Sequence, residues 1–466
     1  METRKEHDSL GDLEVPVNAY YGVQTQRAVV NFPISGMRPL PAFIDATVHV
    51  KRAAAIVNSR LGQLKPEVGE MIVKAADEVL GGKLRDQFVV DVFQAGAGTS
   101  HNMNTNEVLA NLAIEMHGGK RGDYKLVHPN DDVNNGQSTN DVIPTAIRLA
   151  SLMLCQELFK SLETLQQELE KKAKEFDPII KSGRTHLQDA VPVRLGQEFG
   201  AYADMIRQHR DRIKFAADDL SNLGIGGSAA GTGLNTHPKY SAEMAKELTK
   251  ALGIQMRPAR NLMAAMQSMA PFANLSGALR NLALDLIKIA NDFRLMESGP
   301  KTGLGEINLP AMQPGSSIMP GKVNPVMAEM LNMVCFHVCG NDTTVAMAAQ
   351  AGQLELNVMM PVIAYNLLQS VEILSNASRV FATKCVSGIV ANKDRCLFYA
   401  ENSITNVTVL NPLIGYEKAA AVAKESLKTG KTIREVVLEQ NLCTNEQLDK
   451  ALDLAAMTGS TERSAD

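Results

Sequence analysis

The sequence predicts an all-α protein with a central bundle of long helices and smaller N- and C-terminal domains. Five segments carry apolar side chains spaced by three and four, as in an amphipathic helix, and each exceeds the average helix of about 11–12 residues. No run of short alternating strands with turn signals is present, so a sheet-based core is not expected. Long helices joined by polar, glycine-rich segments are typical of a helical bundle.

The clearest helical segment covers residues 154–176, where leucines recur at every third or fourth position and Glu, Gln and Lys fill the opposite face. The other long segments are residues 194–220, 262–296, 326–351 and 361–384. Two shorter helices are expected near the C-terminus, in KTIREVVLEQ and TNEQLDKAL. Changes in pattern predict an N-terminal domain, a central bundle and a small helical C-terminal domain, at residues 1–139, 140–392 and 393–466.

Composition excludes several function classes. The 466 residues carry a net charge of −4 and no long Lys/Arg run, so neither nucleic acid nor an anionic membrane is an expected partner. The N-terminus mixes charges without an apolar core, unlike a secretory signal, and the longest uncharged stretches contain Gln, Ser, Asn and Pro. Cys335 and Cys339 share a helical face without a further ligand nearby, so no metal site is expected. A cytoplasmic protein fits these features.

Two polar clusters precede expected helices. The first contains Ala97 and Thr99 in AGTS, and the second contains Ser138, Thr139 and Asn140 in QSTND. Hydroxyl and amide groups at a helix N-terminus suit a carboxylate ligand. The same residue types are also ordinary helix caps, so each cluster taken alone has a purely structural interpretation.

Two further clusters lie in expected loops. Thr185 and His186 belong to a short loop headed by glycine between long helices, where the imidazole could titrate in the working range of an enzyme. Residues 315–325, GSSIMPGKVNP, do not form a P-loop, because five residues separate the glycines and Val323 follows the lysine. Neither serine lies in a G-x-S-x-G elbow. A glycine-hinged lid over an anionic substrate is expected, with a solvated turn as the alternative.

The four clusters, in this order, resemble those of the fumarase/aspartase superfamily, and GSSIMPGKVNP is highly specific to it. The similarity runs from YYGVQT at residues 20–25 to residues 414–416. The resemblance implies an all-α homotetramer in which three subunits build each active site. It also implies a small dicarboxylate substrate and an anti elimination that gives fumarate through a dianionic aci-carboxylate, which preorganised donors must stabilise.

The resemblance also implies a role for each cluster. Ser316 corresponds to the base, and Lys322 and Asn324 to the groups that hold the carboxylate beside the reacting carbon. His186 would act with Thr185 in the pocket, and Glu329 would orient it. The residues expected to bind the other carboxylate and the leaving group are Thr99, Ser138, Thr139 and Asn140. A second anion site of the kind found in fumarases is expected at His128, Asn130 and Asp131.

The sequence leaves two leaving groups open, ammonia and water, for the same type of elimination. Ala97 and Thr139 favour loss of ammonia from L-aspartate, a reaction of amino-acid metabolism. Residues 226–238, Met360 and the second anion site leave open the alternative, loss of water from L-malate. No organic cofactor is expected, and divalent-cation activation is compatible with the chemistry without being required. A non-catalytic assembly protein that kept the fold is the alternative from another class.

Overall fold

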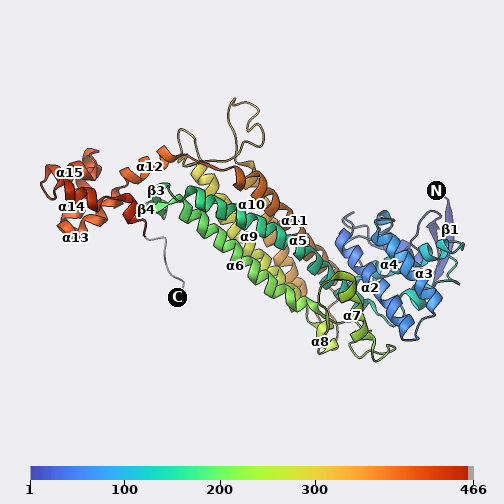
Figure 1. Cartoon of the computed structure of the whole chain (residues 1–466). Helices are drawn as coiled ribbons and strands as arrows, with labels where there is room; N and C mark the ends of the chain where they lie inside the picture. Colours follow the sequence, from blue (N-terminus) through green and yellow to red (C-terminus); the bar gives the residue numbers. More distant parts are fainter. Residues whose placement is uncertain (1, 460–466) are drawn as a thin grey trace. The chain divides into compact units, whose positions relative to one another are not determined.

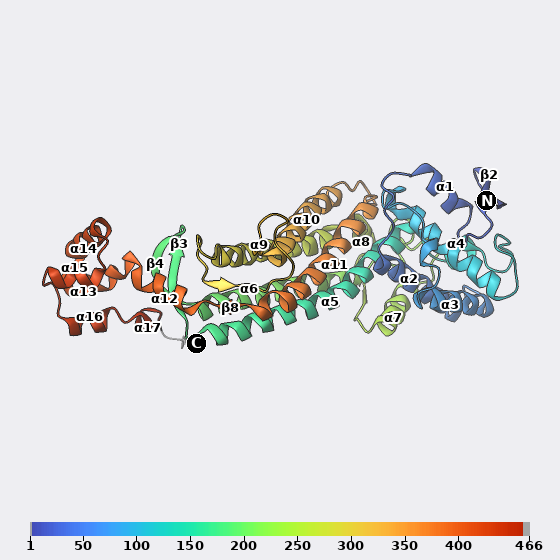
Figure 2. The same cartoon turned by 90° about the horizontal axis from the view of Figure 1, so that it is seen from above.

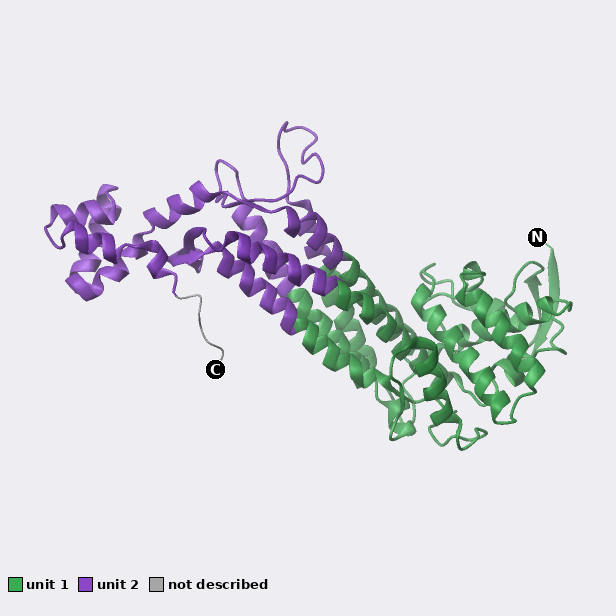
Figure 3. Ribbon diagram, viewed as in Figure 1, with its two compact units in different colours: residues 1–160, 209–284, 334–376 green, residues 161–208, 285–333, 377–466 purple. Residues whose placement is uncertain are grey.

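The structure is a computed structural model that describes residues 2–459 of the chain (Figure 1). The chain divides into two compact units, each built from three separate stretches (Figure 3). Unit 1 comprises Met1–Lys160, His209–Leu284 and Val334–Asn376, and unit 2 comprises Ser161–Gln208, Asp285–Met333 and Ala377–Asp466. The domain limits predicted from the sequence, near residues 140 and 392, stay a prediction.

Five long helices form the bundle, and each contributes residues to both units. They are α5 (Thr139–Phe176), α6 (Leu195–Asp218), α9 (Ala270–Glu297), α10 (Val326–Ala349) and α11 (Met360–Lys384). The helices lie alongside one another in both views (Figures 1 and 2). The described strands pair only in two-stranded sheets, so the predicted all-α class is confirmed.

Two helix boundaries differ from the sequence prediction. α5 runs from Thr139 to Phe176, so the helix expected after QSTND and the amphipathic segment at residues 154–176 are one helix. Residues 141–152 are buried on every face, and therefore no amphipathic stripe joins the two segments in the sequence. The single helix predicted over residues 262–296 is wrong: the chain forms α8 (Leu262–Gln267) and then α9, with Ser268 extended between them. Pro271 explains the break, since within a continuous helix its ring would clash with the carbonyl of Gln267.

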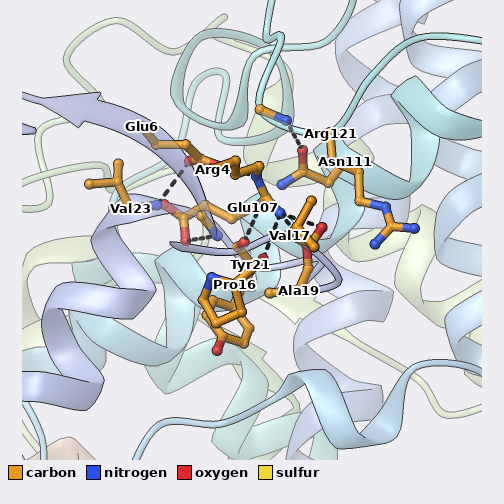
Figure 4. Close-up of polar contacts among 12 residues, drawn as sticks. Arg4, Glu6, Pro16, Val17, Ala19, Tyr21, Val23, Glu107, Asn111 and Arg121 are labelled. Carbon is orange, nitrogen blue, oxygen red and sulfur yellow. Dashed lines mark hydrogen bonds and ion pairs between the residues drawn. The ribbon is translucent and has the colours of Figure 1, made fainter. Parts of the chain in front are cut away.

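The remainder of unit 1 holds the N-terminal part of the chain. Its elements are β1 (Thr3–Asp8), β2 (Gly11–Pro16), α1 (Val23–Asn31), α2 (Pro41–Arg60), α3 (Pro66–Leu80), α4 (Thr99–Met116), β5 (Asn222–Leu223), α7 (Tyr240–Leu252) and β6 (Arg257–Pro258). The Arg4 guanidinium donates to four carbonyl groups between Pro16 and Tyr21 (Figure 4). Glu107 on α4 accepts from the N–H groups of Gly22, Gln24 and Thr25. These contacts anchor the segment YYGVQT.

Unit 2 holds a β-hairpin and the small C-terminal helices. Its further elements are β3 (Ile180–Thr185), β4 (Gln188–Arg194), β7 (Ile307–Asn308), β8 (Val390–Ala391), α12 (Lys393–Asn402), α13 (Asn411–Ile414), α14 (Tyr416–Thr429), α15 (Ile433–Glu439), α16 (Asn445–Ala451) and α17 (Leu454–Met457). The two predicted C-terminal helices are confirmed as α15 and α16. Each begins with a capping box, at Thr432 and Thr444.

The bundle core of unit 2 is aromatic. Phe293 on α9 stacks on Phe199 of α6 at 5.3 Å between ring centroids and on Phe381 of α11 at 5.7 Å. Among the described helices, α5 alone is long and apolar enough to cross a membrane. However, 67% of its most apolar stretch is buried inside the structure, so these side chains pack against protein.

Candidate functional site

The first polar cluster lies at the start of α4. Its N-cap is Gly98, in the left-handed conformation with φ 84°, and no side chain caps the helix. Ala97 is also left-handed, at φ 62°, and its N–H donates to the carbonyl oxygen of Val358 at 2.7 Å. The capping interpretation therefore does not account for Thr99, whose exposed hydroxyl makes only a long 3.4 Å contact with the Gly96 carbonyl. This hydroxyl is available to a ligand.

The second cluster begins α5, and its residues have different roles. Ser138 does cap the helix, since its Oγ accepts from the N–H of Asn140 at 3.2 Å. Thr139 Oγ1 accepts from the side-chain amide of Asn102 at 3.2 Å. The Asn140 side chain donates to the carbonyl of Ala229 at 2.8 Å, which ties it to the glycine-rich segment at residues 226–233.

A cavity of about 800 Å³ in unit 1 is lined by Thr99 and by all three residues of the predicted second anion site. There, His128 Nδ1 accepts from the N–H groups of Asn130 and Asp131 at 3.3 and 3.1 Å. An accepting Nδ1 leaves the ring proton on Nε2, which can donate to a ligand. The structure thus places Thr99 of the first cluster and the predicted second anion site on one cavity.

Buried charges support the unit 1 part of the site, and the sequence analysis missed their roles. Asp141 accepts from the N–H groups of Ser138, Gly226 and Ser228, so it joins the second cluster to the glycine-rich segment. Burial raises the pKa of Asp141 to about 6 and lowers the pKa of the fully buried Lys51 to about 7. A lysine within the otherwise apolar face of residues 43–57 was the sequence signal for this interior charge.

Thr185 and His186 lie at the tip of the β3–β4 hairpin in unit 2, where the sequence analysis expected a loop between helices. Thr185 pairs with Gln188, so His186 and Leu187 form a two-residue turn with φ 55° and 57°. Such turns favour Asn and Gly, and left-handed His and Leu cost about 1–2 kcal/mol each. Backbone strain at an exposed histidine is typical of functional sites. Residues 184–189 show no apolar alternation, so the hairpin was not predicted from the sequence.

A buried carboxylate anchors this hairpin. Glu306, in GEINLP, is fully buried and accepts from the Arg184 guanidinium at 2.9 Å. The other carboxylate oxygen of Glu306 lies 3.1 Å from Nζ of Lys181, which belongs to β3 together with Arg184. Burial opposes the charge of Lys181, but the carboxylates of Glu198 and Glu306 outweigh it and raise the lysine pKa. The base of the hairpin is therefore charged and rigid, while its tip is exposed.

Residues 315–325 form an open loop of unit 2, drawn in olive in Figure 1 and purple in Figure 3. Asn324 closes its base by donating to the carbonyl of Gly315 at 2.7 Å. A Cβ at Gly315 would lie 2.2 Å from the carbonyl oxygen of Lys322, so only glycine allows this approach. Ile318, 83% exposed, and Met319 leave an apolar surface at the tip.

Ser316 has distinctive hydrogen bonding within this loop. Its Oγ accepts from the N–H groups of Ile318 and Met319 at 3.2 and 2.9 Å. Two donors on one hydroxyl oxygen favour negative charge there, as in an oxyanion hole. Lys322 is exposed on the same loop. The predicted hinge glycine Gly321 is left-handed, with φ 80°.

Glu329 lies in the first turn of α10 and is half-buried. Within one copy of the described chain it makes no hydrogen bond to His186, so the predicted pairing of these side chains stays a prediction. Unit 1 carries Thr99, the QSTND residues and the second anion site, and unit 2 carries the hairpin, the loop and Glu329. Across residues 2–459, no group of three His, Cys, Asp or Glu side chains is arranged to hold a metal ion.

Comparisons with known proteins match this arrangement. Residues 11–340 match the family described as "Lyase", and residues 407–459 match "Fumarase C C-terminus". The chain belongs to the fumarase/aspartase superfamily. The family predicted from the four clusters is thereby confirmed. Similar proteins include the aspartate ammonia-lyase of a Bacillus species, 50% identical over 98% of both chains, and that of Escherichia coli K12, 49% identical over 96% of this chain and 94% of that one.

Solved structures of related lyases share the fold of this lyase. Fumarate lyase:delta crystallin from Brucella melitensis, bound to cobalt, has a TM-score of 0.94 and 48% identity, and covers 98% of this chain and 100% of its own. The class II fumarase from Schistosoma mansoni has a TM-score of 0.96 and 39% identity, and covers 99% of this chain and 100% of its own. The bundle fold predicted from the sequence is thus confirmed by comparison as well.

Proposed function

We propose that the protein is an aspartate ammonia-lyase that reversibly converts L-aspartate to fumarate and ammonia. The observation that carries the elimination chemistry is the pair of N–H donors on Ser316 Oγ in the family's loop. The similar proteins named aspartate ammonia-lyase, at 48–50% identity over nearly the whole chain, support L-aspartate as the substrate. The reaction would take place in the cytoplasm as part of amino-acid metabolism.

Ser316 acts as the base in this proposal. A free serine hydroxyl is a weak base, but its alkoxide is stabilised where two N–H groups donate to the oxygen and water is excluded. Ser316 removes a proton from C3 of aspartate, and the electron pair of that C–H bond moves into the adjacent carboxylate to give the aci form. The pair then returns to form the C2=C3 double bond as the C–N bond breaks and ammonia leaves.

The remaining predicted residues stabilise charge around this step. Lys322 neutralises the developing dianion, and Asn324 retains one amide hydrogen that can donate to the same carboxylate. His186 and Thr185 complete the pocket. Thr99, Ser138, Thr139 and Asn140 bind the other carboxylate and the leaving group, with donors for the carboxylate and acceptor oxygens for the ammonium. The step transfers no electrons to a carrier, so no organic cofactor is needed. A divalent ion could act only as an activator.

Loss of water from L-malate is the second candidate, because the chain resembles a class II fumarase in fold and carries the fumarase-like segment at residues 226–238. We expect kcat/KM for L-aspartate to exceed that for L-malate by at least about 10²-fold, since hydrogen-bonding residues at the site discriminate leaving groups. Fumarate release followed by ultraviolet absorbance, with both substrates on one enzyme preparation, measures this ratio. Faster turnover of malate would replace the proposal with the fumarase function.

We also propose a homotetramer with active sites shared between subunits. The bundle helices carry large apolar side chains in solvent, including Phe215 on α6 at 85% exposure and Phe336 on α10 at 59%. Exposed apolar side chains of this size are typical of interfaces. The strained tip at His186 and the loop tip at Ile318 are likewise exposed, which suits segments that enter a neighbouring subunit.

Mixed tetramers test this sharing. Thr139→Val and Ser316→Ala chains should each keep at most about a tenth of wild-type activity, but co-expressed chains should regain up to about a quarter, because random assembly restores some intact sites. Light scattering should give about 200 kDa for each variant, four chains of 50.4 kDa. Differently tagged chains allow the mixed tetramers to be purified. Mixed tetramers with no recovered activity would show that each site lies within one chain.

A further inference from the structure

We propose that Lys51 is a positioning residue that makes Thr139 a hydrogen-bond donor to the substrate. The inference rests on the proposed function and concerns the same site. Lys51 lies on α2, fully buried, and its Nζ donates to Asn134 Oδ1 at 2.8 Å and to Gln137 Oε1 at 2.9 Å. None of the sequence motifs contains Lys51, and it is buried too deeply to meet the substrate itself.

Lys51 and backbone carbonyls together determine how the neighbouring amides are oriented, because Asn134 also donates to the Gln137 carbonyl at 3.2 Å and Gln137 donates to the Val133 carbonyl at 3.0 Å. Lys51 Nζ donates to both side chains, so Asn134 and Gln137 turn their oxygen atoms toward it. Asn134 Oδ1 then accepts two more hydrogen bonds, from the side-chain amides of Asn102 and Asn106, each at 3.2 Å. Since an oxygen faces them, Asn102 and Asn106 must present their NH2 groups. Lys51 and these carbonyls therefore orient four amides.

The orientation of the Asn102 amide determines which hydrogen bond Thr139 receives. The NH2 group of Asn102 has two hydrogens, one directed to Asn134 Oδ1 and the other to Thr139 Oγ1 at 3.2 Å. A threonine oxygen that accepts from Asn102 keeps its own hydrogen for another partner. Asn102 Oδ1 is buried without a hydrogen-bond partner, so no local contact of that oxygen holds the amide in place. Asn134, which Lys51 and the Gln137 carbonyl hold in place, supplies the constraint.

The free hydrogen of the Thr139 hydroxyl determines which substrate group it suits. The free hydrogen of Thr139 can be donated to a carboxylate oxygen, whereas the ammonium of aspartate can only donate and would leave that hydrogen without a partner. Thr139 therefore faces a carboxylate, and the relay from Lys51 through Asn134 and Asn102 selects that orientation before the substrate arrives. Preorganised donors of this kind increase affinity because no reorientation is needed on binding.

Succinate, a dicarboxylate without a leaving group, tests the relay by isothermal titration calorimetry. Lys51→Met should weaken succinate binding about tenfold, the effect of one well-placed hydrogen bond to a charged group. Thr139→Val should weaken it similarly, and the double variant should bind no worse than Thr139→Val alone, because both changes remove the same contact. Additive losses, or unchanged affinity in Lys51→Met, would overturn the proposal.

A pair of substitutions at Asn134 covers the case in which Lys51→Met does not fold. Asn134→Asp keeps an oxygen for Lys51 and for Asn102, so succinate affinity should stay near wild type, whereas Asn134→Leu should lose about tenfold. Equal affinities for the two variants would contradict the relay. Lys172→Met, at a buried lysine of unit 2 that donates to the Ile389 carbonyl, is the matched control. Succinate binding does not depend on turnover, so failure of the aspartase activity is detected separately.

Discussion

Ser316→Ala is expected to lower kcat for L-aspartate by at least roughly 10²-fold, because a lost catalytic base costs that much or more. The oxygen removed is the one that accepts from the N–H groups of Ile318 and Met319, so no other atom of the loop can replace it. KM should change little, since Ser316 acts on the C3 proton and contributes little to binding the ground state. Steady-state fumarate release measures both constants.

The neighbouring serine is the control for this substitution. Ser317 is exposed and of the same type, so Ser317→Ala should keep kcat near wild type. Light scattering and thermal unfolding should show that both variants keep the wild-type assembly and melting temperature. A Ser316→Ala enzyme that retained more than about a tenth of wild-type kcat would exclude Ser316 as the base.

Lys322→Met should lower kcat/KM for L-aspartate by about 10²–10³-fold, comparable to loss of an oxyanion-hole donor. Methionine keeps the length and apolar stem of lysine but cannot neutralise a carboxylate. The loss should appear in kcat as well as in KM, because the charge that Lys322 meets grows as the aci-carboxylate forms. Steady-state kinetics over a range of aspartate concentrations separates these effects.

A second exposed lysine offers the comparison. Lys301 precedes the catalytic loop in unit 2, and Lys301→Met removes one positive charge without touching the loop. Its kcat/KM should stay within about twofold of wild type, since an exposed charge outside the site is largely screened by salt. If both variants lost activity equally, the effect would be one of overall charge, and the carboxylate site would lie elsewhere.

The sequence was sufficient for the family and the chemistry because both depend on local patterns. The loop GSSIMPGKVNP carries the proposed base Ser316, the cation Lys322 and the glycine Gly321 within eleven residues. Helix spacing likewise predicted the bundle, since an amphipathic stripe is visible in residues such as Leu158, Leu162 and Leu165 without knowledge of their partners. Where a helix is buried on every face, as at the start of α5, that stripe disappears, so the sequence did not show that the helix after QSTND continues into residues 154–176.

The tertiary structure decided the features that depend on partners distant in the sequence. It showed that the loop containing Thr185 and His186 is a strained hairpin turn anchored by Glu306, which lies 122 residues beyond Arg184. It also placed Thr99 and His128 on one cavity.

The hydrogen bonding of the Thr139 hydroxyl shows most clearly what the sequence determines and what the folded structure adds. By itself, the sequence determined that a threonine stands beside Ser138 and Asn140 at the start of a helix. Which hydrogen bond its hydroxyl receives depends on Asn102 and Asn134, and Lys51, 88 positions earlier, helps to hold Asn134 in place. A hydroxyl that accepts from Asn102 keeps its own hydrogen for a ligand, and only the folded chain brings Asn102 within 3.2 Å of Thr139.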